Sequence, residues 1–114
     1  MKKQIITTVS IALVAAIFTS SQASAAIDAD AAKSLAKRND CFKCHAVDKT
    51  KKGPSYKKVA LKYKGKPDGE EKLIKNITTA PRVTLEDGTI ETHKIIDTKD
   101  QSEIKNLVGW ILSL

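Results

Sequence analysis

The sequence places two thiols and an imidazole within five consecutive residues, Cys41-Phe42-Lys43-Cys44-His45. Two such thiols can pair as a disulfide, bind a metal ion, or add to the two vinyl groups on one edge of a porphyrin. The C-x-x-C-H order favours the third chemistry, because it is the signature of c-type haem attachment. A helical turn spaces the sulfurs for the two vinyl groups, and the next residue then projects over the ring centre. The motif therefore predicts one covalently bound haem c, attached at Cys41 and Cys44, with His45 as an axial iron ligand.

Two other kinds of site use similar residues. A thioredoxin-like redox pair lies near a βαβ pattern, and this chain shows no pattern of parallel strands. A zinc site needs three or four ligands, and His93 is the only Cys or His outside the motif. A zinc site would thus lack a second clustered pair of ligands, and haem remains the favoured interpretation.

The first 25 residues have the features of a secretory signal peptide. Lys2 and Lys3 precede an apolar run over residues 11–18, and Ala23-Ser24-Ala25 matches the small-x-small cleavage pattern. An uncleaved membrane anchor is the alternative, but the apolar run is shorter than the ~20 residues that span a bilayer. We therefore expect cleavage after Ala25 and a periplasmic protein without stable membrane insertion. Residues 26–114 then form a single domain.

The 89 residues that remain after this cleavage contain few large apolar side chains. Their four aromatic residues are Phe42, Tyr56, Tyr63 and Trp110. A chain of this size buries little apolar area and often needs a cofactor or another staple, and a buried haem would supply one. The formal charge of +7 falls to +5 without the two lysines of the signal peptide. This positive charge either keeps the protein soluble or attracts an acidic partner protein. We do not expect nucleic-acid binding, because the sequence has no stretch in which aromatic residues alternate with basic ones.

Apolar residues at helical spacing predict four short helices, over residues 28–39, 55–63, 68–77 and 99–113. Asp28 or Asp30 can cap the first helix. The pairs Asp68 with Glu71 and Thr98 with Gln101 match the capping-box pattern at the starts of the third and fourth helices. Gly109 within the last helix costs about 1 kcal/mol relative to alanine, which predicts the close approach of another backbone there.

Residues 82–96 give two competing indications. Spaced apolar residues surround Asp87-Gly88, and Asp-Gly is a typical hairpin turn. The same stretch also fits a long irregular loop that covers one face of the haem. His93 lies in this stretch.

Three segments resemble the short class I bacterial cytochromes c, and the likeness extends over residues 31–114. They are CHAVD at 44–48, KGPSYKKVA at 52–60 and NLVGWILSL at 106–114. The resemblance implies an all-α class I cytochrome c fold, with about four short helices around one covalently bound haem. It also implies that the first and last helices cross near Gly109 and Trp110. In this family the proline of the Gly-Pro pair offers its backbone carbonyl to the proximal histidine, so Pro54 would orient His45.

The chain departs from the family at the second axial position. Relatives usually supply a Met from the loop before the last helix, but the single Met of this chain is Met1, which leaves with the signal peptide. His93 lies in the corresponding loop, 17 residues before Trp110, which is close to the family's spacing. An imidazole is mostly neutral at pH 7, whereas a lysine must first lose a proton. We therefore expect His93 to be the second axial ligand, with an open sixth site or a lysine ligand as alternatives.

The expected function is that of a periplasmic monohaem one-electron carrier rather than an enzyme. Imidazole in place of Met predicts a lower potential than that of Met-ligated relatives. The expected partners are redox proteins with an acidic docking surface, which would meet lysines at 43, 49, 51, 52, 57 and 58. Two other functions remain open: a haem protein with an open sixth site for gas binding or catalysis, and an electron-transfer subunit of a larger oxidoreductase.

Overall fold

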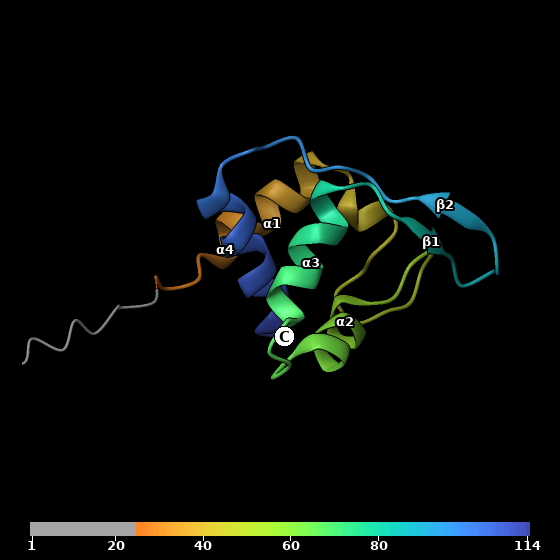
Figure 1. Ribbon diagram of the computed structural model, residues 1–114, viewed down its shortest axis with the longest axis horizontal. Helices are drawn as coiled ribbons and strands as arrows, with labels where there is room; N and C mark the ends of the chain where they lie inside the picture. Colours follow the sequence, from red (N-terminus) through yellow and green to blue (C-terminus); the bar gives the residue numbers. More distant parts are fainter. Residues whose placement is uncertain (1–24) are drawn as a thin grey trace, which may run out of the picture.

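The computed structural model describes residues 25–114, and the predicted signal peptide therefore lies outside the described residues except for Ala25. Within the described part, four helices and one hairpin accompany a short 3-10 turn at Cys41–Lys43 (Figure 1). The elements are α1 (Ala29–Arg38), α2 (Tyr56–Tyr63), α3 (Gly69–Thr78), β1 (Arg82–Thr84), β2 (Ile90–Thr92) and α4 (Gln101–Leu112). All four predicted helices are present. No helix among the described residues has the length and apolar character needed to cross a membrane.

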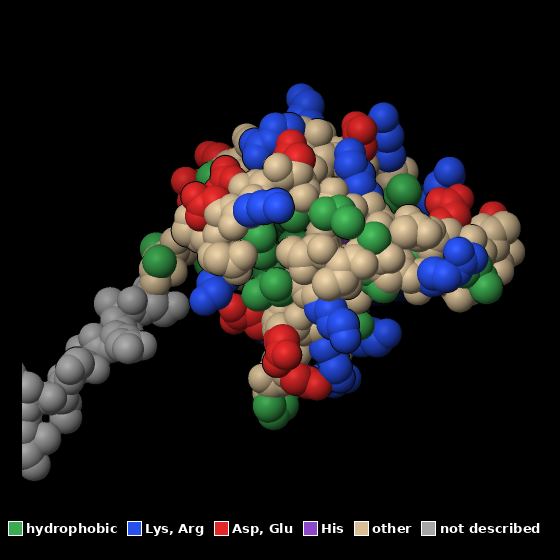
Figure 2. All heavy atoms as spheres, turned by 45° about the horizontal axis from the view of Figure 1, so that its top comes forward, with side chains coloured by type: hydrophobic (Ala, Val, Ile, Leu, Met, Phe, Trp, Pro, Cys, Tyr) green, Lys and Arg blue, Asp and Glu red, His purple; other side chains and the backbone are tan. Residues whose placement is uncertain are grey.

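The hairpin projects from the helical body of the molecule (Figures 1 and 2). Its strands pair antiparallel, with Val83 opposite Glu91. Gly88 supplies the positive φ, 84°, that the turn requires, and the Asp87 carboxylate accepts a hydrogen bond from the Thr89 backbone N–H at 2.9 Å. The hairpin option is thus correct for residues 82–92. Of this stretch, residues 93–96 are irregular, and the chain continues without a helix or strand to residue 100, running back along the molecule to α4.

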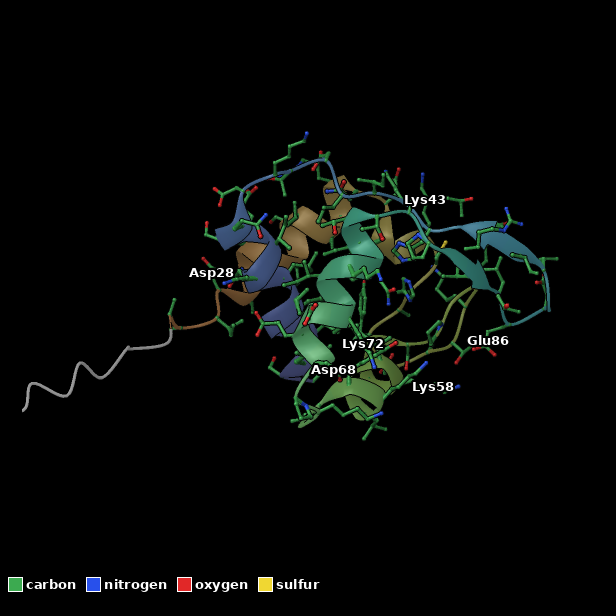
Figure 3. The ribbon with its side chains drawn as sticks, viewed as in Figure 1. Asp28, Lys43, Lys58, Asp68, Lys72 and Glu86 are labelled. Atoms are coloured by element: carbon green, nitrogen blue, oxygen red, sulfur yellow. The ribbon has the colours of Figure 1, made fainter. Side chains whose placement is uncertain are left out.

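Which residue caps each helix depends on its backbone conformation and was only partly predicted from the sequence pattern. Asp28 caps α1 by accepting from the Ala31 N–H at 2.9 Å. The capping box predicted at Asp68 is wrong, because Asp68 has ψ near 9° and makes no cap hydrogen bond, whereas an N-cap residue is extended. Its carboxylate pairs instead with Lys72 at 2.7 Å (Figure 3).

The predicted box at the start of α4 is also wrong. Asp100 is the cap residue: its backbone is extended, and its carboxylate accepts from the Ser102 N–H at 2.8 Å. The Thr98 hydroxyl, which was expected to cap the helix, donates to the Glu103 carboxylate. It also accepts from the Asp100 N–H at 3.1 Å, so Thr98 supports the cap residue from just outside the helix.

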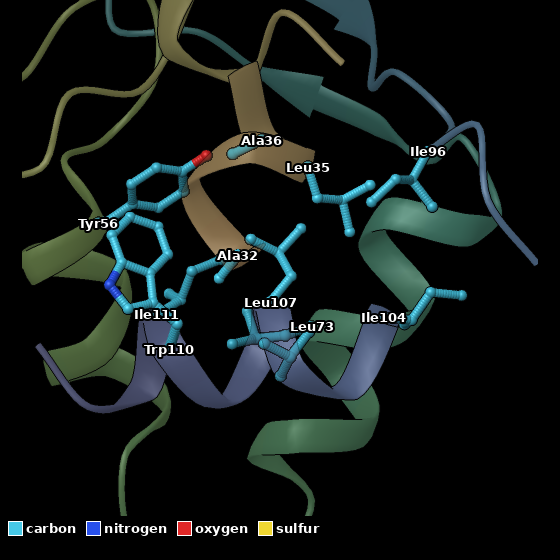
Figure 4. Packing of buried hydrophobic residues seen from close by; sticks show 11 residues of the cluster. Ala32, Leu35, Ala36, Tyr56, Leu73, Ile96, Ile104, Leu107, Trp110 and Ile111 are labelled. Carbon is cyan, nitrogen blue, oxygen red and sulfur yellow. The ribbon is translucent and has the colours of Figure 1, made fainter. Parts of the chain in front are cut away.

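The core lies where α1 packs across α4, with α2 and α3 also against α4 (Figure 4). Apolar residues at helical spacing bury one face of each helix: Ala32, Leu35 and Ala36 from α1, and Ile104, Leu107, Val108 and Ile111 from α4. Asn106 joins the two helices, since its side chain accepts from the Asp28 N–H and donates to the Asp28 carbonyl, each at 2.8 Å. The first and last helices therefore pack together, as the family resemblance implies.

Gly109 faces a side chain and not the backbone that was expected. A Cβ at this position would overlap Cδ1 of Ile27, and no other atom would lie as near. The missing side chain thus makes room for Ile27, which folds over α4 just before α1 begins.

Candidate functional site

The helices and the hairpin enclose a cavity of about 550 Å³, which is within the range of about 300–1,000 Å³ typical of small-molecule and cofactor sites. The 3-10 turn and the residues after it supply Cys41, Cys44 and His45. Apolar side chains of α2, α3 and α4 form most of the remaining wall, including Tyr56, Leu73, Ile77, Leu107, Val108 and Ile111. Val83, His93 and Ile96 also line the cavity. The cavity thus brings together Cys41, Cys44 and His45 of the C-x-x-C-H motif and His93 of the later loop.

The motif adopts a tight turn that places both thiols on the cavity wall. The turn begins after Asp40, which has a φ of 58°, and the His45 N–H donates to the Cys41 carbonyl at 2.9 Å. Both cysteines are free thiols and half-buried. Burial is the main cause that raises the pKa of the Cys41 thiol, so this sulfur is protonated at neutral pH. Both cysteines therefore line the cavity.

His45 is held in one orientation by its neighbours. Its Nδ1 lies 2.7 Å from the Pro54 carbonyl oxygen, which can only accept, so Nδ1 carries the hydrogen and Nε2 keeps its lone pair. The ring stacks on Tyr56 with centroids 5.2 Å apart. Burial lowers the pKa of His45, so the imidazole is neutral, and its Nε2 is available to bind a metal ion.

His93 faces His45 across the cavity. Their ring centroids are 6.1 Å apart with the rings tilted by 40°. The Nδ1 of His93 lies 2.9 Å from the Lys94 carbonyl oxygen, so Nδ1 carries a hydrogen, and in the neutral imidazole Nε2 is the nitrogen with the lone pair. The His93 N–H donates to the Pro81 carbonyl at 2.8 Å, which ties this residue to the base of the hairpin.

The spacing of the two imidazoles fits a metal ion between them. Two metal–imidazole bonds of about 2.0 Å each place the two nitrogens about 4 Å apart, and the ring centroids about 6 Å apart. The observed 6.1 Å matches this arrangement. The cavity volume, its apolar wall and the two adjacent thiols also suit a haem. Among residues 25–114 no three His, Cys, Asp or Glu side chains gather as a metal-binding group.

Four lysines line the cavity: Lys43, Lys58, Lys62 and Lys94. We call these four residues the lysine rim. Figure 2 shows that lysine and arginine side chains are spread over much of one face of the molecule. Lys43 and Lys58 were expected near the site (Figure 3), whereas Lys49, Lys51, Lys52 and Lys57 lie outside the cavity wall. Sequence reasoning missed Lys62 and Lys94. Their signals were the i, i+4 spacing of Lys62 from Lys58 on one helix and the adjacency of Lys94 to His93.

Comparisons with known proteins agree with this geometry. The sequence model of the family "Cytochrome c" matches residues 29–114. Cytochrome c-551 of Allochromatium vinosum is 31% identical over 80 residues, covering 70% of this chain and 82% of that protein. Cytochrome c-552 of Nitrosomonas europaea is 34% identical over 86 residues, covering 75% of this chain and 81% of that protein.

A solved structure gives a closer match. The crystal structure of the class 1 cytochrome MtoD from Sideroxydans lithotrophicus ES-1 superposes with a TM-score of 0.74 at 60% sequence identity, covering 77% of this chain and 97% of that one. The expected all-α class I cytochrome c fold is thereby confirmed. From the family match, the relatives and the shared fold together, the chain belongs to the cytochrome c family, as a short class I electron-transfer protein with one covalently attached haem c.

Proposed function

We propose that this cytochrome is a periplasmic one-electron carrier whose haem is attached through Cys41 and Cys44 and bound axially by His45 and His93. The observation that carries the ligand assignment is the pair of imidazoles that face each other across the cavity with centroids 6.1 Å apart. Haem iron supplies a one-electron redox change, and the protein sets its potential through ligands, burial and hydrogen bonds.

Backbone carbonyls prepare both imidazoles for this role. The Pro54 carbonyl holds Nδ1–H of His45, and the Lys94 carbonyl holds Nδ1–H of His93. Such hydrogen bonds fix the tautomer and ring orientation and raise the basicity of the ligating nitrogen. Because imidazole replaces the Met of related cytochromes, and Met raises the potential, we expect a lower potential than in Met-ligated relatives.

The lysine rim supports docking of an acidic partner protein. Lys58 and Lys62 lie one turn apart on α2 at the cavity wall, and together with the predicted mature charge of +5 they would attract an acidic surface. Lys43 and Lys94 contribute less, since both lie near the carboxylate of Asp40, at 3.1 and 3.7 Å. The partner would thus meet the side of the molecule formed by α2.

The spectra of purified holoprotein in both oxidation states test the ligand assignment. We expect a low-spin haem in wild type and a high-spin haem that binds carbon monoxide readily in His93→Ala. The matched control is Ile95→Ala, since Ile95 is exposed, lies two residues away and does not line the cavity; its spectrum should equal that of wild type. A His93→Ala spectrum identical to wild type would place the second ligand elsewhere.

Mass spectrometry of protein from a periplasmic fraction tests attachment and export together. We expect one species that begins at Ala26 and carries the mass of one haem. Cys41→Ser and Cys44→Ser should each remove one thioether bond. A species that retains residues 1–25 would contradict cleavage after Ala25, and a haem-free mass under conditions of haem attachment would contradict the thioether assignment.

A further inference from the structure

Three consecutive residues just before Cys41 contact the segment that follows His93. Arg38 lies 3.2 Å from the Asp97 carboxylate, and Asp40 lies 3.7 Å from the Lys94 ammonium. Asn39, between them, also bonds to Asp97. The contacts from Asn39 join residues that are 58 apart in sequence, one on the stretch leading into the haem motif and the other on the stretch leading away from His93.

Asn39 is the buried member of this group. It is 2% exposed, and its Nδ2 donates to the Leu35 carbonyl at 3.0 Å and to Oδ1 of Asp97 at 2.9 Å. Its Oδ1 accepts from the Asp97 N–H at 2.9 Å. Both hydrogens of the amide and its oxygen are thus used, as a buried polar side chain requires.

The two ion pairs beside Asn39 are exposed. The side chains of Arg38 and Asp97 are 50% and 51% exposed, and those of Lys94 and Asp40 are 57% and 52% exposed. Exposed pairs of this kind add little to stability. Of these contacts between the two segments, the buried amide is therefore expected to contribute most to stability.

The segment that carries His93 is also fastened at two other points, and Ile96 within it is buried in the core. Residues 93–100 form no helix or strand. The His93 N–H donates to Pro81, and the Ile96 N–H donates to the Ile77 carbonyl, each at 2.8 Å. Beyond Ile96, the bonds from Asn39 to Asp97 hold the end of the segment nearest to α1. Their loss would loosen this end of the segment and leave His93 held chiefly by the hydrogen bonds to Pro81 and Ile77.

We propose that Asn39 is a positioning residue for His93: its buried side chain fastens the 93–97 segment to the chain that leads into the haem motif and slows the release of His93 from iron. The proposal rests on the proposed function, in which His93 is an axial ligand. Asn39 hydrogen-bonds to neither imidazole and acts on His93 through Asp97 and the intervening backbone.

The test is the rate at which the reduced holoprotein binds carbon monoxide, since the gas can bind only after His93 leaves. Asp97→Ala removes the acceptor for Nδ2 of Asn39, whereas Asp97→Asn keeps an acceptor oxygen and the backbone N–H but removes the charge. We expect Asp97→Ala to bind carbon monoxide at least about tenfold faster than wild type, as the loss of a hydrogen bond to a charged group implies. Asp97→Asn should fall between wild type and Asp97→Ala, because its neutral amide oxygen accepts a weaker hydrogen bond.

Asn39→Asp removes both N–H donors of the amide at nearly constant size, and it should also bind carbon monoxide faster than wild type. If this variant fails to fold, the comparison of Asp97→Ala with Asp97→Asn tests the proposal. Ala32→Gly is the stability control, because it weakens α1 two turns away from Asn39, and its rate should change less than about twofold. If Asp97→Ala and Ala32→Gly bound carbon monoxide at equal rates at matched thermal stability, Asn39 would have no positioning role. The assignment of His93 as a ligand would not be affected by that result. If wild type bound the gas as fast as His93→Ala, the ligand assignment itself would fail, and the positioning role with it.

Discussion

Gly53 leaves no room for a side chain beside His45, and we predict that Gly53→Ala disturbs the proximal ligand. A Cβ at this position would lie 2.8 Å from Cε1 and 3.1 Å from Nδ1 of His45. The ring cannot retreat freely, because Pro54 holds Nδ1 at 2.7 Å and Tyr56 stacks on the ring. Overpacking of this kind costs about 1–3 kcal/mol. In a domain of about 60–100 residues each 1 kcal/mol lowers Tm by about 4–8 °C, so Tm should fall by roughly 4–24 °C.

Thermal unfolding and the absorption spectrum of holoprotein provide the assay, with Gly65→Ala as the control. Gly65 has a φ of 74°, and a Cβ there would meet nothing within 4 Å, so alanine strains the backbone by about 1–2 kcal/mol without touching the cavity. Gly53→Ala should lower Tm and also alter the spectrum, whereas Gly65→Ala should lower Tm alone. A Gly53→Ala protein with the Tm and spectrum of wild type would refute the claim that His45 is fixed from both sides.

Three further predictions concern a cap, a carboxylate and the lysine rim. Ser55→Ala should destabilise the protein by about 1 kcal/mol, measured by chemical denaturation, because the buried Ser55 hydroxyl accepts from the Lys58 N–H at the start of α2; an unchanged midpoint would contradict this. The hydrogen bond from Asn39 is the main cause that lowers the pKa of Asp97 below its ordinary value of 3.8. The extra stability from the ionised carboxylate is therefore fully present above the ordinary pKa and lost as the pH falls through the lowered pKa, so the stability difference between wild type and Asp97→Ala should be larger at pH 7 than below that pH. Lys58→Glu with Lys62→Glu should slow electron transfer to an acidic partner at low salt and should match wild type near 1 M salt, where the screening length is about 3 Å; a slowing that ignores salt would exclude an electrostatic role.

The site was predictable where its chemistry is contiguous in sequence. Cys41, Cys44 and His45 stand within one turn, so their residue types and order are enough to indicate haem attachment. Helical spacing of apolar residues likewise indicates a helix wherever one face is buried, as in α4. The caps could not be predicted equally well, because Asp68 and Asp100 are both plausible caps in sequence and differ in backbone ψ, 9° against 112°.

The far side of the cavity depends on contacts that local pattern does not reveal. His93 was assigned by family spacing and by the lack of a Met, and neither argument gives its distance from His45. The sequence identifies Asn39 only as the last residue of a predicted helix. Its hydrogen-bond partner Asp97 lies 58 residues away, so no local pattern indicates their contact. Ile27 occupies the space beside Gly109, and the glycine alone could not distinguish a side-chain neighbour from a backbone one.

The pairing of α1 with α4 also constrains how the molecule can assemble. The hydrogen bonds between Asp28 and Asn106 span 78 residues, and the loop that they close contains the haem motif, α2, α3 and the hairpin. Closing so long a loop costs conformational entropy, and folding slows as contact order rises. The cavity is complete only when α4 is docked on α1. The backbone amides of these two helices should accordingly exchange with solvent through global unfolding, and those of residues 93–100 through smaller local openings.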